Sequence, residues 1–249
     1  MKNAFQDFLT GFKYPFKSFG YLRIPRILYM SIIPALINVF IYTTIFILTY
    51  RYIINLSGSV SGLNQPDPGF FNYFFHITIL LISFILLLFI CYLAFVIFGG
   101  IISAPFNEQI SIKVEEMISG HKFVNKNGFW KDAWLSIKAE IVKLAFYFAV
   151  IIPLFIIGFF PVIGAPVSTI FGFIFSAFYN ALDFMDYPMT RDLFPLSRKI
   201  KVVKSKFMLS FGFGTAAFLI LFLPVINALL KPILVISGTA IFFEKNFKV

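Results

Sequence analysis

Three basic residues stand at places in the chain where a cation could attract a small anion. Arg23 and Arg26 come just before a charge-free run that begins at Ile27, and Lys231 interrupts a later apolar run. An arginine fork matches the geometry of a tetrahedral oxyanion, and a helix N-terminus offers it free N–H groups. The sequence therefore predicts anion binding at Arg23, Arg26 and Lys231. The plainer alternatives are that the arginines anchor a span and that Lys231 snorkels to the membrane surface.

A second group of polar residues could line a pore or control access to it. Carboxylates beside basic residues can form a charged network, or they can simply pair at the surface, where each pair contributes little. An asparagine inside a span can touch an ion or bond to another helix. The residues that we assign to this network are Asn38, Asn107, Glu115, Glu140, Asp186 and Arg191.

Two long apolar runs are each interrupted by the letters PVI and a turn-forming residue. The first reads FFPVIGAPV (159–167) and the second FLPVINALLKPILV (222–235), so we expect hairpin tips at Pro161 and Gly164, and at Pro224 and Asn227. Paired interruptions of this kind are typical of broken helices in transport proteins. The charge-free arms of the first run, about 17 residues or 25 Å each, are near the lower limit for spanning a bilayer. The arm after Lys231 is shorter, which favours hairpins that do not fully cross over pairs of full spans.

Composition identifies an integral membrane protein. Of the 249 residues, 59% are hydrophobic and only 13% are charged, and the mean hydropathy is +0.90. One cysteine, Cys91, excludes an internal disulfide. With two histidines besides, the chain offers no zinc-type cluster, and we expect no metal and no cofactor. No nucleophile–base set or phosphate loop is visible, so we do not expect an enzyme.

The placement of charge predicts the topology. Of the 21 Lys and Arg residues, all except Arg51 and Lys231 flank apolar runs. One topology places all of these flanking residues on the same face of the membrane. The positive-inside rule makes that face cytoplasmic, together with both termini. The net charge of +10 then reflects topology and anionic lipid, and no nucleic acid is expected as a partner.

We expect an all-α fold in one membrane domain, residues 1–249. It would combine two long spanning helices, two Pro/Gly-broken and hemi-penetrating hairpins, and amphipathic helices that lie on the membrane surface or continue the spans. The expected parts are an interfacial N-terminal helix (1–26), spans (27–50 and 73–101), amphipathic cytoplasmic helices (104–143), a first hairpin (144–182), a basic linker (183–206) and a second hairpin (207–243).

Five segments carry a family resemblance. SAPFNEQISIKVEE (103–116), ALDFMDYPMTRDLF (181–194), FGFG (211–214), LPVIN (223–227) and GTA (238–240) occur in an order that resembles the CysZ sulfate permease family, within the group named for etoposide-induced protein 2.4. The similarity runs from about residue 33 to residue 244.

This resemblance implies a bacterial inner-membrane permease or channel that passes sulfate inward for cysteine biosynthesis. It also implies two long spans, two hemi-penetrating hairpins and assembly into homo-oligomers. A Gly-Leu-Arg motif near the first span is associated with sulfate binding in the family, whereas this chain has Arg26, Ile27 and Leu28 after Pro25. The alternative function is a membrane scaffold or lipid-interacting protein without ion flux.

Overall fold

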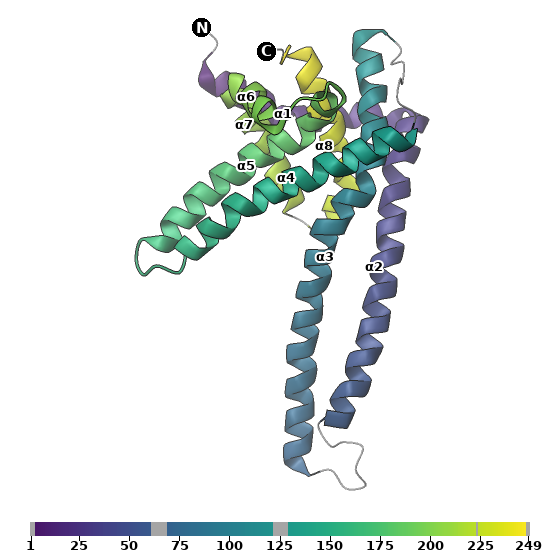
Figure 1. Cartoon of the computed structure of the whole chain (residues 1–249), viewed down its shortest axis with the longest axis vertical. Helices are drawn as coiled ribbons and strands as arrows, with labels where there is room; N and C mark the ends of the chain where they lie inside the picture. The colour runs from purple at the N-terminus through teal and green to yellow at the C-terminus, as the bar shows by residue number, and fades with distance from the viewer. Residues whose placement is uncertain (1–2, 61–68, 122–128, 223, 248–249) are drawn as a thin grey trace. The chain divides into compact units, whose positions relative to one another are not determined.

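The fold is all-α over the residues described by the computed structural model, which are 3–60, 69–121, 129–222 and 224–247. No strand occurs among them, which confirms the fold class predicted from the sequence (Figure 1). The elements are α1 (Ala4–Ser18), the 3₁₀ helix η1 (Phe19–Arg23), α2 (Pro25–Val60), α3 (Phe70–Ser119), α4 (Phe129–Ile157), α5 (Gly164–Arg191), α6 (Leu196–Ser205), α7 (Phe207–Leu221) and α8 (Pro224–Glu244).

Four helical segments are long and apolar enough to cross a membrane. They are Pro25–Asn55, Phe70–Tyr92, Ile137–Ile157 and Gly164–Arg191, and the bent pair of α6 and α7 would raise the number to five. Few side chains of the first three are buried within the protein, as expected where lipid covers an apolar helix. The described part of the chain is therefore a multi-pass helical membrane protein.

The chain divides into two compact units. Residues 35–102 form one unit, in which parts of α2 and α3 line an apolar cavity of about 180 Å³. Cys91 of α3 and Tyr42 of α2 are among the residues that line the cavity. Residues 1–34 and 103–249 form the second unit, which contains most of the buried side chains and all of the buried ion pairs described below.

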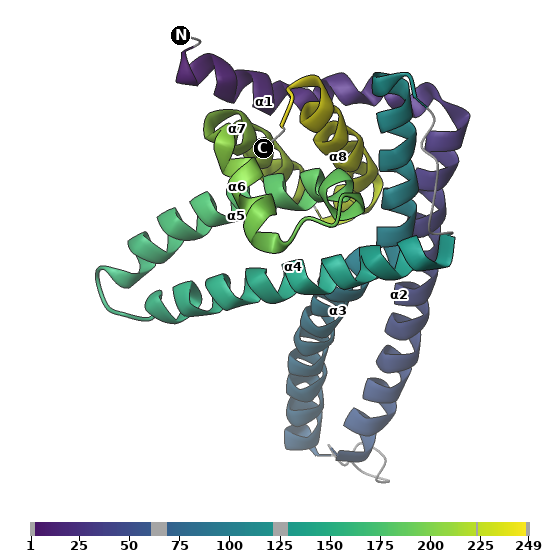
Figure 2. The same cartoon turned by 45° about the horizontal axis from the view of Figure 1, so that its top comes forward.

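In the second unit, α1 packs on α7 and α8, and α5 packs on α4, α7 and α8 (Figure 2). Glycines let these backbones approach closely. A Cβ on Gly212 would collide with the carbonyl oxygen of Phe8 in α1, and a Cβ on Gly214 would collide with that of Ala177 in α5. Small residues at such crossings are a common device in membrane helix packing.

The N-terminal helix α1 is part of the packed unit. Gly11, Tyr14, Pro15 and Ser18 are buried on the side of α1 that faces its neighbours. The Tyr14 hydroxyl donates a hydrogen bond to the Glu244 carboxylate at 3.0 Å, which joins α1 to the end of α8. Burial, reinforced by this bond, raises the pKa of Tyr14, so the phenol remains a donor.

The first interrupted run forms a tight turn between α4 and α5. Pro161 lies in this turn, and Val162 next to it has a positive φ of 68° and a side chain that is 92% exposed. Gly164 is the first residue of α5, and a Cβ there would collide with the carbonyl oxygen of Ile157. A glycine at this position therefore allows the two helices to meet at the turn.

The helices on either side of this turn are longer than the charge-free arms suggested. The apolar segments Ile137–Ile157 and Gly164–Arg191 contain 21 and 28 residues. At 1.5 Å per residue they extend about 31 Å and 42 Å, which is enough to cross a bilayer core of about 30 Å. The difference arises because both helices continue through charged residues that are buried within the protein.

The amphipathic stretches between residues 104 and 143 belong to longer helices, which is one of the two arrangements expected from the sequence. The patterned stretch after Pro105 continues α3 to Ser119, and the stretch around Trp134 is the beginning of α4. At the second interruption α8 begins at Pro224, so Asn227 lies in its first turn and the helix continues through Lys231. The second arm of this hairpin, helix α8, is therefore 21 residues long. The charge-free run after Lys231 alone has only about 12 residues.

Candidate functional site

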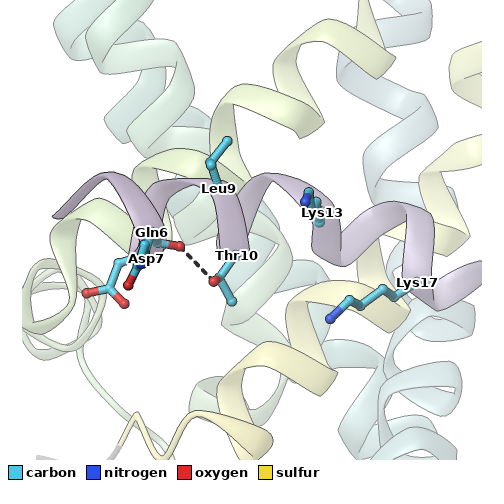
Figure 3. A pocket seen from close by; sticks show the side chains of 6 residues that line it. All are labelled: Gln6, Asp7, Leu9, Thr10, Lys13 and Lys17. Carbon is cyan, nitrogen blue, oxygen red and sulfur yellow. Dashed lines mark hydrogen bonds between the residues drawn. The ribbon is translucent and has the colours of Figure 1, made fainter. Parts of the chain in front are cut away.

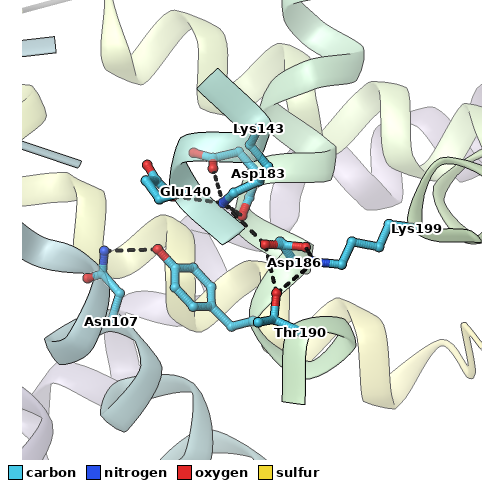
Figure 4. A network of polar contacts seen from close by, with 8 residues as sticks. Asn107, Glu140, Lys143, Asp183, Asp186, Thr190 and Lys199 are labelled. Atoms are coloured by element: carbon cyan, nitrogen blue, oxygen red, sulfur yellow. Dashed lines mark hydrogen bonds and ion pairs between the residues drawn. The ribbon is translucent and has the colours of Figure 1, made fainter. Parts of the chain in front are cut away.

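Lys143 of α4 is the centre of a buried set of ion pairs. Its Nζ atom lies 2.5 Å from Oδ1 of Asp183, 2.9 Å from Oε2 of Glu140 and 3.4 Å from Oδ2 of Asp186 (Figure 4). The lysine is 2% exposed, and it also lies over the ring of Tyr187 at 5.4 Å. A buried lysine needs such partners, because an isolated charge in a low-dielectric interior is very costly.

Asp186 connects this set to α6. Its Oδ1 atom lies 2.5 Å from Nζ of Lys199, and its Oδ2 atom accepts a hydrogen bond from Thr190 at 3.0 Å. Lys199 in turn donates to the Thr190 hydroxyl at 2.7 Å. Asp186 and Lys199 are both buried, so α4, α5 and α6 are held by one continuous chain of polar contacts.

Arg191, the last residue of α5, connects the same region to α3. Its two terminal nitrogens bind different carboxylates: Nη1 donates to Glu108 at 2.7 Å, and Nη2 donates to Glu115. Nη1 also donates to the Ser111 hydroxyl at 3.2 Å. Glu108, Ser111 and Glu115 recur every three or four residues, which places them on one face of α3.

Two further hydrogen bonds extend the polar contacts to other helices. The Asn107 amide donates to the Tyr187 hydroxyl at 3.0 Å, and the Thr239 hydroxyl of α8 donates to Ser111 at 2.9 Å. All four residues are buried. We use the term ionic network for the eight charged residues Glu108, Glu115, Glu140, Lys143, Asp183, Asp186, Arg191 and Lys199.

The ionic network is rich in negative charge. It contains five carboxylates and three cationic side chains. Lys231 of α8, which is half-buried, interacts electrostatically with Glu140 and Asp183 and so supplies a fourth positive charge. An arrangement of this kind binds and fixes helices well, but it offers an anion few positive charges that are not already matched.

Arg23 and Arg26 lie apart from the ionic network in their contacts. Arg23 ends η1 and Arg26 is the second residue of α2, and both side chains are exposed. The first-turn N–H groups of a helix have no intrahelical acceptor, and Pro25 at the first position suits this start. The anion site predicted from the sequence thus falls at a helix start.

The structure brings five of the six predicted network residues into the ionic network or into contact with it. Glu115, Glu140, Asp186 and Arg191 belong to the ionic network, and Asn107 is linked to it through Tyr187. Asn38 lies in the other unit, where its side chain is 6% exposed.

The sequence analysis does not identify several members of the site. In the sequence Lys143 and Lys199 indicate only topology, and nothing there marks Glu108, Tyr187, Ser111 or Thr239. A helical-face count would have found some of them, because Asp183, Asp186 and Thr190 recur at intervals of three and four, as do Glu140 and Lys143. The residues that join this site from distant segments of the chain show no such spacing in the sequence.

A shallow pocket of about 410 Å³ lies along α1, outside this network (Figure 3). Its lining includes Asp7, Lys13 and Lys17, together with Thr10, whose hydroxyl donates to the Gln6 carbonyl.

Within the described part of the chain, no group of three or more His, Cys, Asp or Glu side chains is arranged to hold a metal ion.

The fold and the site together define a class: a multi-pass α-helical membrane protein whose helices are joined through a buried ionic network. Comparison with known proteins gives the family. Residues 14–232 match the sulfate transporter CysZ/etoposide-induced protein 2.4 family, so the chain belongs to it.

Comparison with individual relatives agrees with this assignment. The chain is 28% identical over 235 residues to the sulfate transporter CysZ of Vibrio parahaemolyticus, covering 93% of each chain. It is 30% identical over 189 residues to that of Vibrio atlanticus, covering 75% of this chain and 74% of the other. It is 24% identical over 238 residues to that of Pectobacterium atrosepticum, covering 95% and 85%. The resemblance read from the sequence motifs is confirmed.

Proposed function

We propose that this protein is a sulfate permease or channel that admits sulfate for cysteine biosynthesis. The observation that carries the proposal is the match along nearly the whole chain to relatives named as sulfate transporters. The all-α membrane fold supports it, because a passage for ions needs several helices across the bilayer. This function is transport, and we assign the chain no enzymatic reaction.

The start of α2 is the proposed anion-binding position. Arg23 and Arg26 are exposed, and no buried carboxylate of the ionic network is recorded in contact with them. Sulfate carries two negative charges and four acceptor oxygens, which suit an arginine fork and free helix N–H groups. This chain lacks the glycine of the family motif, and its helix α2 begins at Pro25, after which the first-turn N–H groups can donate.

Lys231 has a different role in this proposal. Glu140 and Asp183 already interact with it, so an incoming anion would have to compete with two carboxylates. We infer that Lys231 first balances the acid-rich network and contributes to anion attraction only through its long-range field. The ionic network itself holds α3, α4, α5 and α6 together and so sets the shape of any passage between them.

The proposed setting is the bacterial inner membrane, with both termini in the cytoplasm and assembly into a homo-oligomer. The distribution of Lys and Arg supports this orientation. The turns between α4 and α5 and between α7 and α8 are the proposed tips of hairpins that penetrate part of the bilayer. The helix lengths also permit full crossing, so the depth of the tips requires direct measurement.

Flux measurement tests the function. Purified protein in liposomes should take up radiolabelled sulfate faster than empty vesicles, and unlabelled sulfate should compete better than chloride or phosphate. Uptake equal to that of empty vesicles for sulfate and for the other anions would overturn the transport proposal and leave the scaffold alternative. Flux of another anion without sulfate flux would retain the channel and overturn its specificity.

A further inference from the structure

The helix α6 has a strongly basic exposed face. Arg198, Lys201 and Lys204 are exposed, whereas Lys199, Val202 and Val203 point into the protein. The sequence contains no acidic residue between Asp192 and Glu244, so this stretch of the chain has a large excess of positive charge. Arg198 and Lys204 also lie over the rings of Phe194 and Phe178, at 4.0 Å and 5.9 Å.

The orientation of α6 is fixed by the elements around it. A bend of 103° separates α6 from α7, across Lys206 alone. α7 is apolar along its whole length and packs between α1 and α5. If α7 enters the bilayer, a helix at this angle to it lies close to the plane of the membrane surface. The Lys199–Asp186 pair and buried Val202 and Val203 hold α6 in that orientation.

Apolar side chains protrude at both ends of the basic face. Leu193, just before α6, has a positive φ of 56° and is 70% exposed. Phe207 and Met208, just after it, are 40% and 41% exposed. Segments that lie in the headgroup region typically combine cations with large apolar side chains, and the apolar side chains reach the acyl chains.

We propose that the exposed face of α6 is a binding surface for anionic phospholipid headgroups of the membrane that holds the protein. Arg198, Lys201 and Lys204 bind the headgroup phosphates, and Leu193, Phe207 and Met208 insert beneath them. The surface is separate from the arginines at the start of α2, so this inference does not rest on sulfate transport. The protruding apolar groups favour a lipid surface over an acidic soluble protein, which would bind the cations without them.

Native mass spectrometry of the purified protein in detergent with added lipid tests the proposal. We expect bound phosphatidylglycerol to exceed phosphatidylcholine for the natural protein. A triple variant with Arg198→Gln, Lys201→Gln and Lys204→Gln should lose this preference roughly tenfold or more, because each cation near an anionic surface contributes about 1 kcal/mol. A control with Lys113→Gln, Lys131→Gln and Lys138→Gln makes the same change in net charge elsewhere.

The proposal would be overturned by retention of phosphatidylglycerol in the α6 variant, or by an equal loss in the control variant. A milder variant, Lys201→Gln alone, replaces the triple variant if its melting temperature is lowered, and it should give a several-fold loss. No loss in this single variant would also overturn the proposal. In liposomes of phosphatidylcholine alone, the α6 variant should take up sulfate as the natural protein does, which separates this proposal from that of transport.

Discussion

Lys143 and Asp183 form a buried ion pair, with Nζ and Oδ1 2.5 Å apart and the lysine 2% exposed. The pair joins α4 to α5 at a level where both helices have the composition of membrane spans. Charged residues in such segments are expensive and are normally paired and functional. This pair therefore explains how the two helices carry charge within otherwise apolar sequences.

Replacement of Lys143 should strongly destabilise the protein. The variant Lys143→Met leaves Glu140, Asp183 and Asp186 without their shared cation, a loss that costs about 3–5 kcal/mol for a buried pair. Thermal unfolding in detergent, followed by intrinsic fluorescence, measures the change. Lys138→Met on the same helix is the control, because that side chain is exposed, and it should melt near the natural protein. Equal melting of both variants would contradict the structural role of the pair.

Replacement of Arg191 by lysine should not preserve its role. One ammonium group cannot reproduce a planar fork whose separate nitrogens bind Glu108 and Glu115. We expect Arg191→Lys to lower the melting temperature clearly and Arg191→Gln to lower it further. Lys113→Gln removes a partly exposed pair with Glu116 and should change the melting temperature little. A melting temperature of Arg191→Lys equal to that of the natural protein would show that the fork geometry is unimportant.

A single added methyl group at Gly214 should disrupt helix packing. The Cβ in Gly214→Ala would overlap the carbonyl oxygen of Ala177, and backbone must move to relieve it, at a cost of about 1–3 kcal/mol. Gly172→Ala is the matched control, because nothing lies within 4 Å of the Cβ that it adds. That control should be neutral or slightly stabilising, since alanine favours a helix by about 1 kcal/mol over glycine. The prediction fails if Gly214→Ala melts as high as Gly172→Ala.

Loss of Arg26 should weaken sulfate binding without loss of the fold. Its exposed side chain has no part in the ionic network, so Arg26→Ala should keep its melting temperature. A charge-assisted hydrogen bond contributes about 1.5–3 kcal/mol, which corresponds to a decrease in sulfate affinity of roughly tenfold or more. Scintillation proximity binding with labelled sulfate measures it, and Lys138→Ala is the control. Unchanged affinity in Arg26→Ala would remove this residue from the site.

Cysteine labelling measures how deeply the first hairpin enters the bilayer. In a variant with Cys91→Ser, a cysteine at Val162 occupies the most exposed position of the α4–α5 turn. For a hemi-penetrating hairpin we expect slow reaction with a membrane-impermeant maleimide added from outside. Ser61 lies between the two predicted spans (27–50 and 73–101), a segment that the predicted cytoplasmic termini put on the outer side. A cysteine at Ser61 should therefore react quickly and serves as the reference. Equal rates at both positions would establish two full spans.

The sequence by itself determined that this is an all-α membrane protein with interruptions in two apolar runs, because apolar content and turn residues are local properties. It also determined the family, through motifs that lie along the chain in order. The sequence did not predict the helix lengths. A charged residue ends a span only where water or lipid surrounds that residue. Glu140, Lys143, Asp183 and Asp186 are surrounded by one another, and the helices continue through them.

Only the tertiary structure decided which charges meet. Lys199 belongs to α6 and Glu108 to α3, and neither has a neighbour in sequence that predicts its partner. The same is true of Gly214, whose small size matters because Ala177 lies against it. Pairing between segments that are far apart in the chain depends on the packing of α3, α4, α5 and α7, and the long-range fold alone brings these groups within contact distance.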